Sequence, residues 1–281
     1  MSTGRICSVI AGSILFLLLT VLTEIGGAVW LVSHFLVGRW PFCRQSLLRQ
    51  FLVGLAVALV LYPFFIFVIV PPLAAALSRT RLPCAATVDE TIMPATPLTC
   101  LLNRGYLRPE LRSLLDQLGT EMARRFPGSR MTTLEAGFPF IDGFPMLPHL
   151  SHRDGRKVDI AFFYLDSETR MPIASGSPSP LGYFRYEHPK AGEMLSCFGR
   201  WTPLRWDFAW FQPERPAWVI DEGRTAATLD WLKNNPRVSR IFIEPYLARR
   251  LGENGGKVRF QGCFAARHDD HIHIEMASKL P

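Results

Sequence analysis

Two long apolar runs fill most of the first 77 residues, and no other feature constrains the fold of this chain as strongly. The first run covers residues 6–38 and is interrupted by a single charge, Glu24. The second covers residues 51–77 and carries no charge. A helix needs about 20 mostly apolar residues to cross a bilayer. We therefore expect residues 1–77 to form two transmembrane helices.

The arginines around these runs predict which end of the chain lies on which side of the membrane. Short loops that are rich in Lys and Arg stay in the cytoplasm. The loop between the runs carries Arg39, Arg44 and Arg49. With two spans, three further arginines lie on the other side of the membrane and weaken this prediction: Arg5, Arg79 and Arg81. We expect the loop inside, and both termini, with everything that follows the second run, outside.

Glu24 is the one acidic residue within an apolar run. An ionisable side chain inside a bilayer is costly and often functional. The alternative is that the first helix ends near Glu24, or that Glu24 faces the second helix. We favour this structural alternative.

The composition changes after residue 77. Residues 78–104 are rich in Pro and Thr and predict a linker. Residues 108–126 predict an amphipathic helix that begins at Pro109, because the leucines that follow recur at helical spacing. Strand-like and helical segments then alternate irregularly, which favours an α+β domain over residues 105–281. We expect a central, largely antiparallel sheet flanked by helices.

Four of the six cysteines belong to this downstream part: Cys84, Cys100, Cys197 and Cys263. None forms a C-x-x-C pair, so a thiolate zinc site is not indicated. In a domain outside the cytoplasm they would form two disulfides, and the sequence leaves three pairings open. The alternative is four buried thiols.

Five of the seven histidines lie in two short stretches, residues 149–160 and 267–276. In a strand, residues two apart share a face, so His271 and His273 point the same way. Asp159 falls on another predicted strand, and His152 on the loop before it. Histidines with a carboxylate suit a zinc ion that keeps its fourth position open for water. Either motif alone is more often structural.

Together the two stretches resemble the signature regions of the penicillin-insensitive murein endopeptidases. That family is related to the lysostaphin-type peptidases, the D-alanyl-D-alanine metallopeptidases and the hedgehog domain. Its first pattern is H-x-S-H followed by a glycine and an aspartate, met here by His149, Ser151, His152, Gly155 and Asp159. Its second pattern is H-x-x-H-x-H, met here by His268, His271 and His273. The resemblance covers roughly residues 100–276.

The resemblance implies a role for each of these side chains. One Zn²⁺ ion would be held by three ligands: His152, Asp159 and His273. His271 would be the catalytic histidine, and His149 and His268 would flank the pocket and orient water, substrate or ligands. Asp269 and Asp270 are candidates to accept hydrogen bonds from the ligating histidines, which usually donate their other N–H to a carboxylate, but we favour the alternative of a solvated turn.

The function implied is a membrane-anchored zinc metalloendopeptidase that hydrolyses peptide cross-links of peptidoglycan. It would lie in the bacterial inner (cytoplasmic) membrane as a multi-pass protein, with its C-terminal domain in the periplasm. Its partners would be peptidoglycan peptides and the lipid bilayer, since no pattern indicates nucleic-acid binding. One alternative is a catalytically inactive zinc domain that binds wall peptides or a protein partner. Another is a related D-Ala-D-Ala carboxypeptidase or amidase.

Four tryptophans gather in one stretch: Trp201, Trp206, Trp210 and Trp218. Aromatic rings of this kind can stack on sugars or line a peptide groove. Core packing is the commoner reason for such a cluster, and it is the interpretation we favour.

Overall fold

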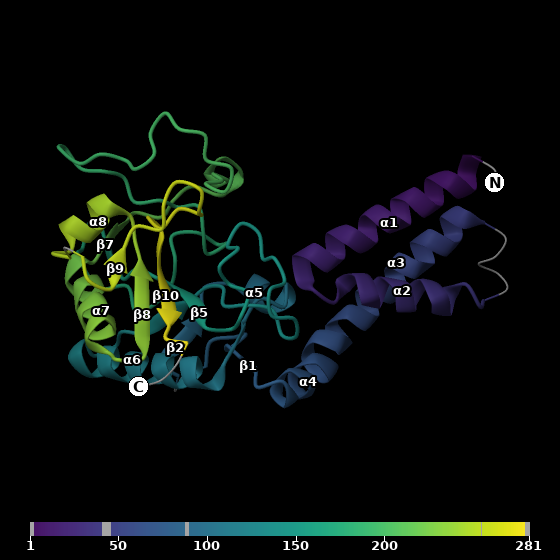
Figure 1. The fold of residues 1–281 in the computed structure, drawn as a ribbon, viewed down its shortest axis with the longest axis horizontal. Coiled ribbons are helices and arrows are strands. Elements are labelled where there is room, and N and C mark those ends of the chain that lie inside the picture. Colours follow the sequence, from purple (N-terminus) through teal and green to yellow (C-terminus); the bar gives the residue numbers. More distant parts are fainter. Residues whose placement is uncertain (1–2, 41–45, 88–89, 254, 279–281) are drawn as a thin grey trace.

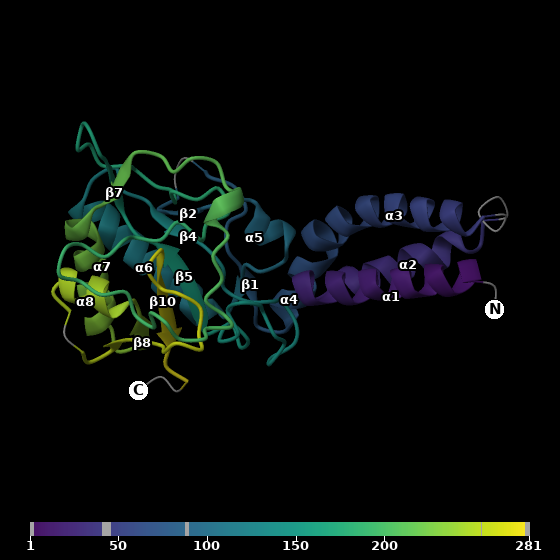
Figure 2. The same cartoon turned by 90° about the horizontal axis from the view of Figure 1, so that it is seen from above.

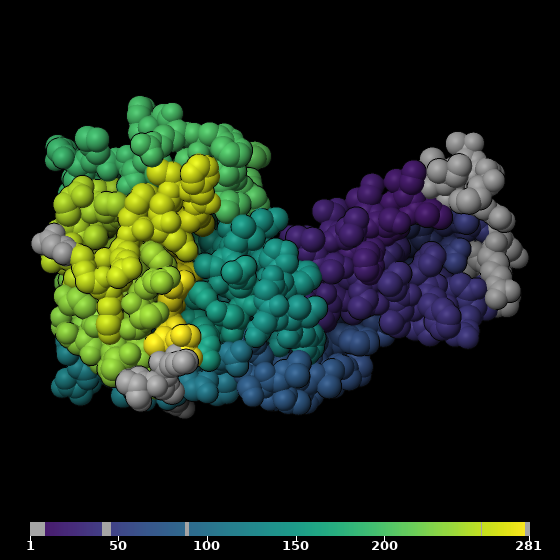
Figure 3. Space-filling model, in the orientation of Figure 1, coloured from purple at the N-terminus to yellow at the C-terminus, as the bar shows by residue number. Residues whose placement is uncertain are grey.

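A computed structural model describes residues 3–40, 46–87, 90–253 and 255–278. It consists of a helical region and an α+β domain, and Figures 1 and 2 show the helices projecting from one side of the domain. The space-filling view gives the same outline, with the apolar N-terminal part as a rod beside a rounded body (Figure 3). Arg44 of the predicted cytoplasmic loop lies outside the described residues.

The first apolar run forms two helices, so the prediction of a single span there is wrong. Helix α1 covers Thr3–Thr23 and α2 covers Gly26–Val37. The two helices run side by side in opposite directions (Figures 1 and 2). Within the described residues, only the second run gives a helix long and apolar enough to cross a membrane.

Local conformation explains the break. Glu24 adopts a left-handed backbone conformation with φ of 67°, which ends α1 because an L-residue cannot continue a right-handed helix there. Gly27 then lets α2 approach α1 closely, since a Cβ at this position would lie 2.8 Å from the Phe16 carbonyl oxygen. The structural interpretation of Glu24, as the end of the first helix, therefore holds.

The second run is one continuous helical stretch, Leu47–Ala76, of 30 residues. It comprises α3 (Leu47–Phe64), a π-helical turn η1 (Phe65–Ile69) and α4 (Val70–Ala76). Pro63 lies just before the π-helical turn, which fits the usual link between Pro and irregular helix hydrogen bonding. At 1.5 Å per residue this stretch is about 45 Å long, more than the hydrocarbon thickness of a bilayer.

The domain is built on a mixed six-stranded sheet in the order β2-β4-β5-β10-β8-β9. The three central pairings are antiparallel, whereas β2 with β4 and β8 with β9 are parallel. The strands are β2 (Ile92–Pro94), β4 (Met131–Thr133), β5 (Lys157–Ala161), β8 (Val238–Phe242), β9 (Val258–Arg259) and β10 (His271–Met276). The α+β class is confirmed. The sheet, predicted as largely antiparallel, is mixed, because its two outer pairings are parallel.

Helices α6 (Pro109–Arg125) and α7 (Glu222–Asn234) pack on one face of this sheet. The leucines of α6 share a core with Val158 and Ile160 of β5 and with Ile272 and Ile274 of β10. A short helix, α8 (Pro245–Arg250), follows β8. Because strand side chains alternate, the intervening residues of β5 and β10 face away from this core. Those residues include Asp159, His271 and His273.

Smaller elements complete the domain. They are β1 (Thr80–Arg81), α5 (Leu98–Leu101), β3 (Tyr106–Leu107), β6 (Tyr164–Asp166), η2 (Ala209–Phe211) and β7 (Trp218–Ile220). The segment predicted as a linker, residues 78–104, supplies β1, β2 and α5 and is packed, with Ile92 fully buried in the core. Two disulfides join Cys84 to Cys100 and Cys197 to Cys263, which selects one of the three pairings.

Candidate metal site

Two neighbouring strands bring the separated histidine stretches together. In the antiparallel pairing of β5 with β10, His273 lies directly opposite Asp159. His152 approaches from the loop before β5, which turns at Gly155 with φ of 67°. A side chain at Gly155 would also collide with the Arg79 guanidinium. The residues predicted as metal ligands therefore meet on the sheet face opposite α6 and α7.

Three donor atoms converge at this point. His152 Nε2 and His273 Nδ1 lie 2.9 Å apart, and Asp159 Oδ1 lies 3.1 Å and 2.8 Å from them. All three side chains are essentially inaccessible to solvent. Ligand atoms around a tetrahedral zinc ion are separated by about 3.3 Å, given metal–ligand distances of about 2.0 Å. The three residues could therefore hold a single metal ion.

The surroundings prepare His152 to bind a metal. Its Nδ1 donates a hydrogen bond to the Ala136 carbonyl oxygen at 2.6 Å. The lone pair of Nε2 is then the one that points toward a metal, as is usual for ligating histidines. Burial lowers the pKa of His152, although Asp159 opposes that shift. The imidazole is therefore neutral at pH 7, which is the form that binds a metal.

Asp159 links this group to a second one. Its Oδ2 accepts a hydrogen bond from the Tyr183 hydroxyl at 2.8 Å and lies 3.5 Å from both His149 Nδ1 and His271 Nε2. His149, Asp159 and His271 thus form another set that is able to hold a metal ion. The carboxylate is held ionised, since its pKa lies well below the usual value: burial raises it, but His152 and His271 outweigh that effect.

His271 is oriented by its sequence neighbour. Its Nδ1 lies 2.5 Å from Asp270 Oδ1, whereas its buried Nε2 has no hydrogen-bond partner. Burial alone would lower the pKa of His271, but Asp159 and Asp270 outweigh it and raise the pKa to about 9. An imidazole with one nitrogen fixed by a carboxylate and the other free has the arrangement of a general acid–base group.

The remaining residues of the second motif are also buried. His268 packs with its ring centre 5.0 Å from that of His271 and 5.4 Å from that of His273. Asp269 pairs with Arg267 and accepts a hydrogen bond from Tyr246. The interpretation of Asp269 and Asp270 as a solvated turn is wrong, because both side chains are buried. Hydrogen bonds to neighbouring side chains compensate for the loss of water.

Sequence reasoning missed two residues beside the site. Glu135 Oε2 lies 3.0 Å from His149 Nδ1, and its backbone N–H donates to the Tyr183 hydroxyl oxygen at 3.0 Å. Glu135 is a lone acid in an otherwise apolar, strand-like stretch, and this signal was available in the sequence. No comparable signal marks Tyr183. Its pKa is raised well above the usual value by burial and by Asp159 and Glu135, so the phenol keeps its proton.

A long irregular segment, residues 183–217, lies against the site through Tyr183, which hydrogen-bonds Asp159, and Phe184, which hydrogen-bonds Asp270. A cavity of only about 10 Å³ remains beneath it, lined by His149, Tyr183, Trp206 and Asp270 among others. The expectation that all four tryptophans pack in the core is wrong: Trp201 and Trp210 on this segment are 78% and 81% exposed. Trp218 does pack against the core.

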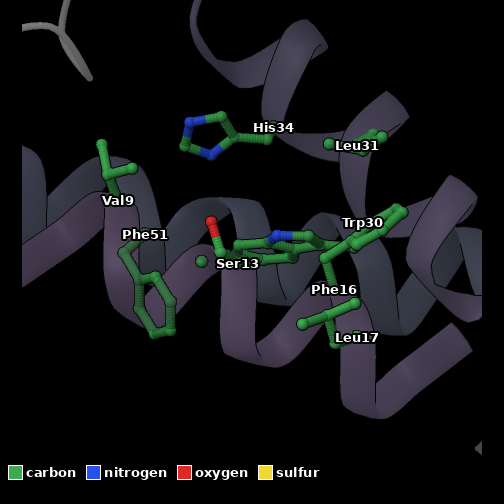
Figure 4. A pocket seen from close by; sticks show the side chains of 9 residues that line it. Val9, Ser13, Phe16, Leu17, Trp30, Leu31, His34 and Phe51 are labelled. Carbon is green, nitrogen blue, oxygen red and sulfur yellow. The ribbon is translucent and has the colours of Figure 1, made fainter. Parts of the chain in front are cut away.

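A separate cavity of about 450 Å³ lies between α1, α2 and α3. Figure 4 shows its lining, with the Trp30 indole between Phe16 and the His34 imidazole. The His34 Nδ1 atom is buried there without a hydrogen-bond partner. None of the residues of the two histidine motifs lines this cavity, so it is distinct from the metal site.

No protein-family model matches this chain, and neither does any curated protein.

Proposed function

We propose that this chain is a membrane-anchored zinc metalloendopeptidase that cleaves peptide cross-links of peptidoglycan outside the cytoplasmic membrane. One observation carries the proposal: the donor atoms of His152, Asp159 and His273 converge, with His271 Nε2 unpartnered beside them. This arrangement provides three ligands and one acid–base group. It is the complement that metal-assisted hydrolysis requires.

Zinc fits this set of donors. Two imidazole nitrogens and one carboxylate oxygen are ordinary zinc ligands, and three protein ligands are typical of catalytic zinc sites. A bound zinc ion would supply activated water with a pKa of about 7 and polarise an amide carbonyl. The chain itself would supply His271 for proton transfer, held in position by Asp270, and the Tyr183 hydroxyl to fix Asp159.

The peptidoglycan substrate rests on the resemblance of the two histidine motifs to the murein endopeptidases. The location rests on other features. Large apolar side chains of the helical region are exposed, among them Leu48, Leu59, Val60 and Phe35, as expected for contact with lipid. The two disulfides of the domain suit an oxidising compartment such as the periplasm.

The helical hairpin changes the expected topology. The first turn of α1 and the start of α3 both lie at the end of the helical region remote from the domain (Figures 1 and 2). If α3 to α4 crosses the bilayer, the N-terminus lies in the cytoplasm and the domain outside. We therefore expect a reporter at the N-terminus to be active only in the cytoplasm, and one after Pro281 only in the periplasm. Both reporters active on the same side would exclude this topology.

The test of the function uses the full chain, purified in detergent and loaded with zinc. Incubation with peptidoglycan should release peptides with cleaved cross-links, identified by mass spectrometry. His188→Ala, which removes an exposed histidine outside the motifs, should cleave at the wild-type rate. Release of terminal D-alanine alone, or of sugar chains free of peptide, would identify a carboxypeptidase or an amidase instead. Intact peptidoglycan with zinc bound would reject hydrolysis.

One observation favours a second candidate, a zinc domain that binds wall peptides or a protein partner without hydrolysis. The five side chains of the two candidate metal sets, and His268 beside them, are each at most 6% exposed. The cavity beside His149, Tyr183 and Asp270 has no room for a peptide. A hydrolase must therefore move residues 183–217 to admit substrate, whereas a structural zinc site needs no such movement.

Zinc binding to the metal-free protein is expected to release at least about one proton per ion near pH 7. His271 is protonated at this pH, since its pKa is raised to about 9, and a nearby dication must expel that proton. Apparent zinc affinity should consequently increase as the pH rises from 6 to 9. Isothermal titration in buffers of different ionisation enthalpy measures the proton count directly. A binding heat that is the same in every buffer would contradict this prediction.

A further inference from the structure

The end of α1 meets the domain next to the metal site, through Arg104. The Arg104 Nε atom donates to the Leu22 carbonyl oxygen in the last turn of α1, at 3.2 Å. Its Nη1 atom donates to Glu135 Oε1 at 2.8 Å and to the Leu147 carbonyl oxygen at 3.2 Å. One guanidinium therefore joins the membrane-side helix to two points of the domain.

Glu135 continues the connection. Its second oxygen, Oε2, lies 3.0 Å from His149 Nδ1, and this nitrogen lies 3.5 Å from Asp159 Oδ2. A series of polar contacts thus runs from Leu22 through Arg104, Glu135 and His149 to Asp159. We call this series the Arg104–Glu135 link.

The link is buried. Arg104, Glu135 and His149 are 6%, 8% and 6% exposed, so water does not readily replace any of these contacts. The last carbonyl oxygens of a helix lack partners within the helix and lie at the negative end of its dipole. A guanidinium suits them, and its planar, fixed donors fit several acceptors at once, which a lysine does not do. Displacement of α1 would therefore disturb the other contacts of Arg104.

A second connection starts from the same turn. The Glu24 carboxylate accepts hydrogen bonds from the backbone N–H groups of Phe140 and Ile141, at 3.1 Å and 2.7 Å. Phe140 and Ile141 belong to the same segment, residues 138–152, as His149 and His152. The end of α1 and the turn after it thus hold both the segment that carries His149 and, through Arg104, the Glu135 carboxylate that orients His149.

We propose that Arg104 and Glu135 are positioning residues that make the α1–α2 hairpin part of the metal site, so that movement of the hairpin reorients His149 and changes turnover. Among the described residues, neither forms a hydrogen bond or ion pair with His152 or His273, and neither belongs to a candidate metal set. The effect on turnover rests on the proposed hydrolase function. The effect on the geometry of the site does not.

The test is a double-mutant cycle on the full chain in detergent, with Glu24→Gln and Glu135→Gln alone and combined. Both changes keep the side-chain size but remove the charge that makes the contacts. Glu135→Gln should retain one metal per chain and lower kcat about 10- to 100-fold with KM unchanged, as for other residues that orient a metal site. Glu24→Gln should lower kcat about 5-fold. The double variant should match Glu135→Gln alone, because both residues act through His149, which has then already lost the carboxylate that orients it.

The same four proteins loaded with Co²⁺ give a readout that needs no turnover. Glu24→Gln should shift the visible absorption of Co²⁺ in the wild-type background and leave it unchanged in the Glu135→Gln background. Glu110→Gln, at an exposed position in the first turn of α6, should match the wild type throughout. If all proteins lack activity but the Co²⁺ cycle behaves as described, the link stands and the proposed function fails. Independent effects of the two substitutions on the Co²⁺ spectrum would overturn the link.

Discussion

Asp159→Asn is expected to abolish metal binding and peptidoglycan cleavage together. Asp159 Oδ1 lies within 3.1 Å of both His152 Nε2 and His273 Nδ1, and its negative charge is the only one among the three ligands. An amide at this position keeps the shape but loses the charge that stabilises a dication. Because metal assistance contributes several kcal/mol to such reactions, cleavage should fall by at least about 1000-fold. Metal content by mass spectrometry and cleavage rate measure the two effects.

His271→Gln separates the proposed metal ligands from the proposed catalytic histidine. His271 belongs to the second group, on the Oδ2 side of Asp159. This variant should therefore keep one metal per chain and still lose cleavage about 100- to 10,000-fold, the usual contribution of a general acid–base group. Asp230→Asn, on the exposed surface of α7, serves as the matched control for the aspartate. Metal loss in His271→Gln would show that the other histidine group holds the ion. Full metal content in Asp159→Asn would overturn both candidate ligand sets, since Asp159 belongs to each of them.

Removal of the Cys197–Cys263 disulfide is expected to lower the free energy of unfolding by about 4 kcal/mol, on the chain-entropy model. The bond closes a loop with a sequence separation of 66 residues. It also fastens the irregular segment 183–217, in which η2 is the only helix among the described residues. Substitution of both cysteines by serine should lower the Tm of the domain by about 10 °C. Thermal unfolding of the detergent-solubilised chain, followed by circular dichroism, measures this change.

The other disulfide supplies the comparison. Cys84–Cys100 closes a loop with a sequence separation of 16 residues, and the same model assigns it about 3 kcal/mol. Its double serine variant should therefore be destabilised somewhat less. A reducing agent should lower the Tm of the wild type at least as far as either variant. If Cys84, Cys100, Cys197 and Cys263 were all free thiols in the purified wild type, both the disulfides and the oxidising location would be rejected.

Local patterns in the sequence predicted the helices and strands of the domain well. Leucines at helical spacing marked α6, and the alternation in residues 157–161 and 271–276 marked β5 and β10 with the correct faces. These patterns are reliable because a helix or strand repeats over a few residues, and burial on one face leaves a matching periodicity. The same alternation placed His271, His273 and Asp159 away from the core before the strands were paired.

The break in the first apolar run was harder to predict. Composition shows only that residues 6–38 avoid water, and a single span satisfies that condition as well as a hairpin does. The decision depends on the left-handed conformation of Glu24 and on the contacts of its carboxylate with Phe140 and Ile141, 116 and 117 residues further along. Such contacts between distant segments leave no periodic trace in the sequence.

The sequence by itself determined which side chains are able to bind a metal, and on which face of their own strand they lie. Only the tertiary structure decided that Asp159 and His273, 114 residues apart, stand opposite each other. It likewise decided which cysteines pair, and that Asp269 and Asp270 are buried. The reason is physical: the type of a residue and its local spacing fix its chemistry and orientation. Strand pairing, loop closure and burial depend instead on the free energy of the whole packed chain.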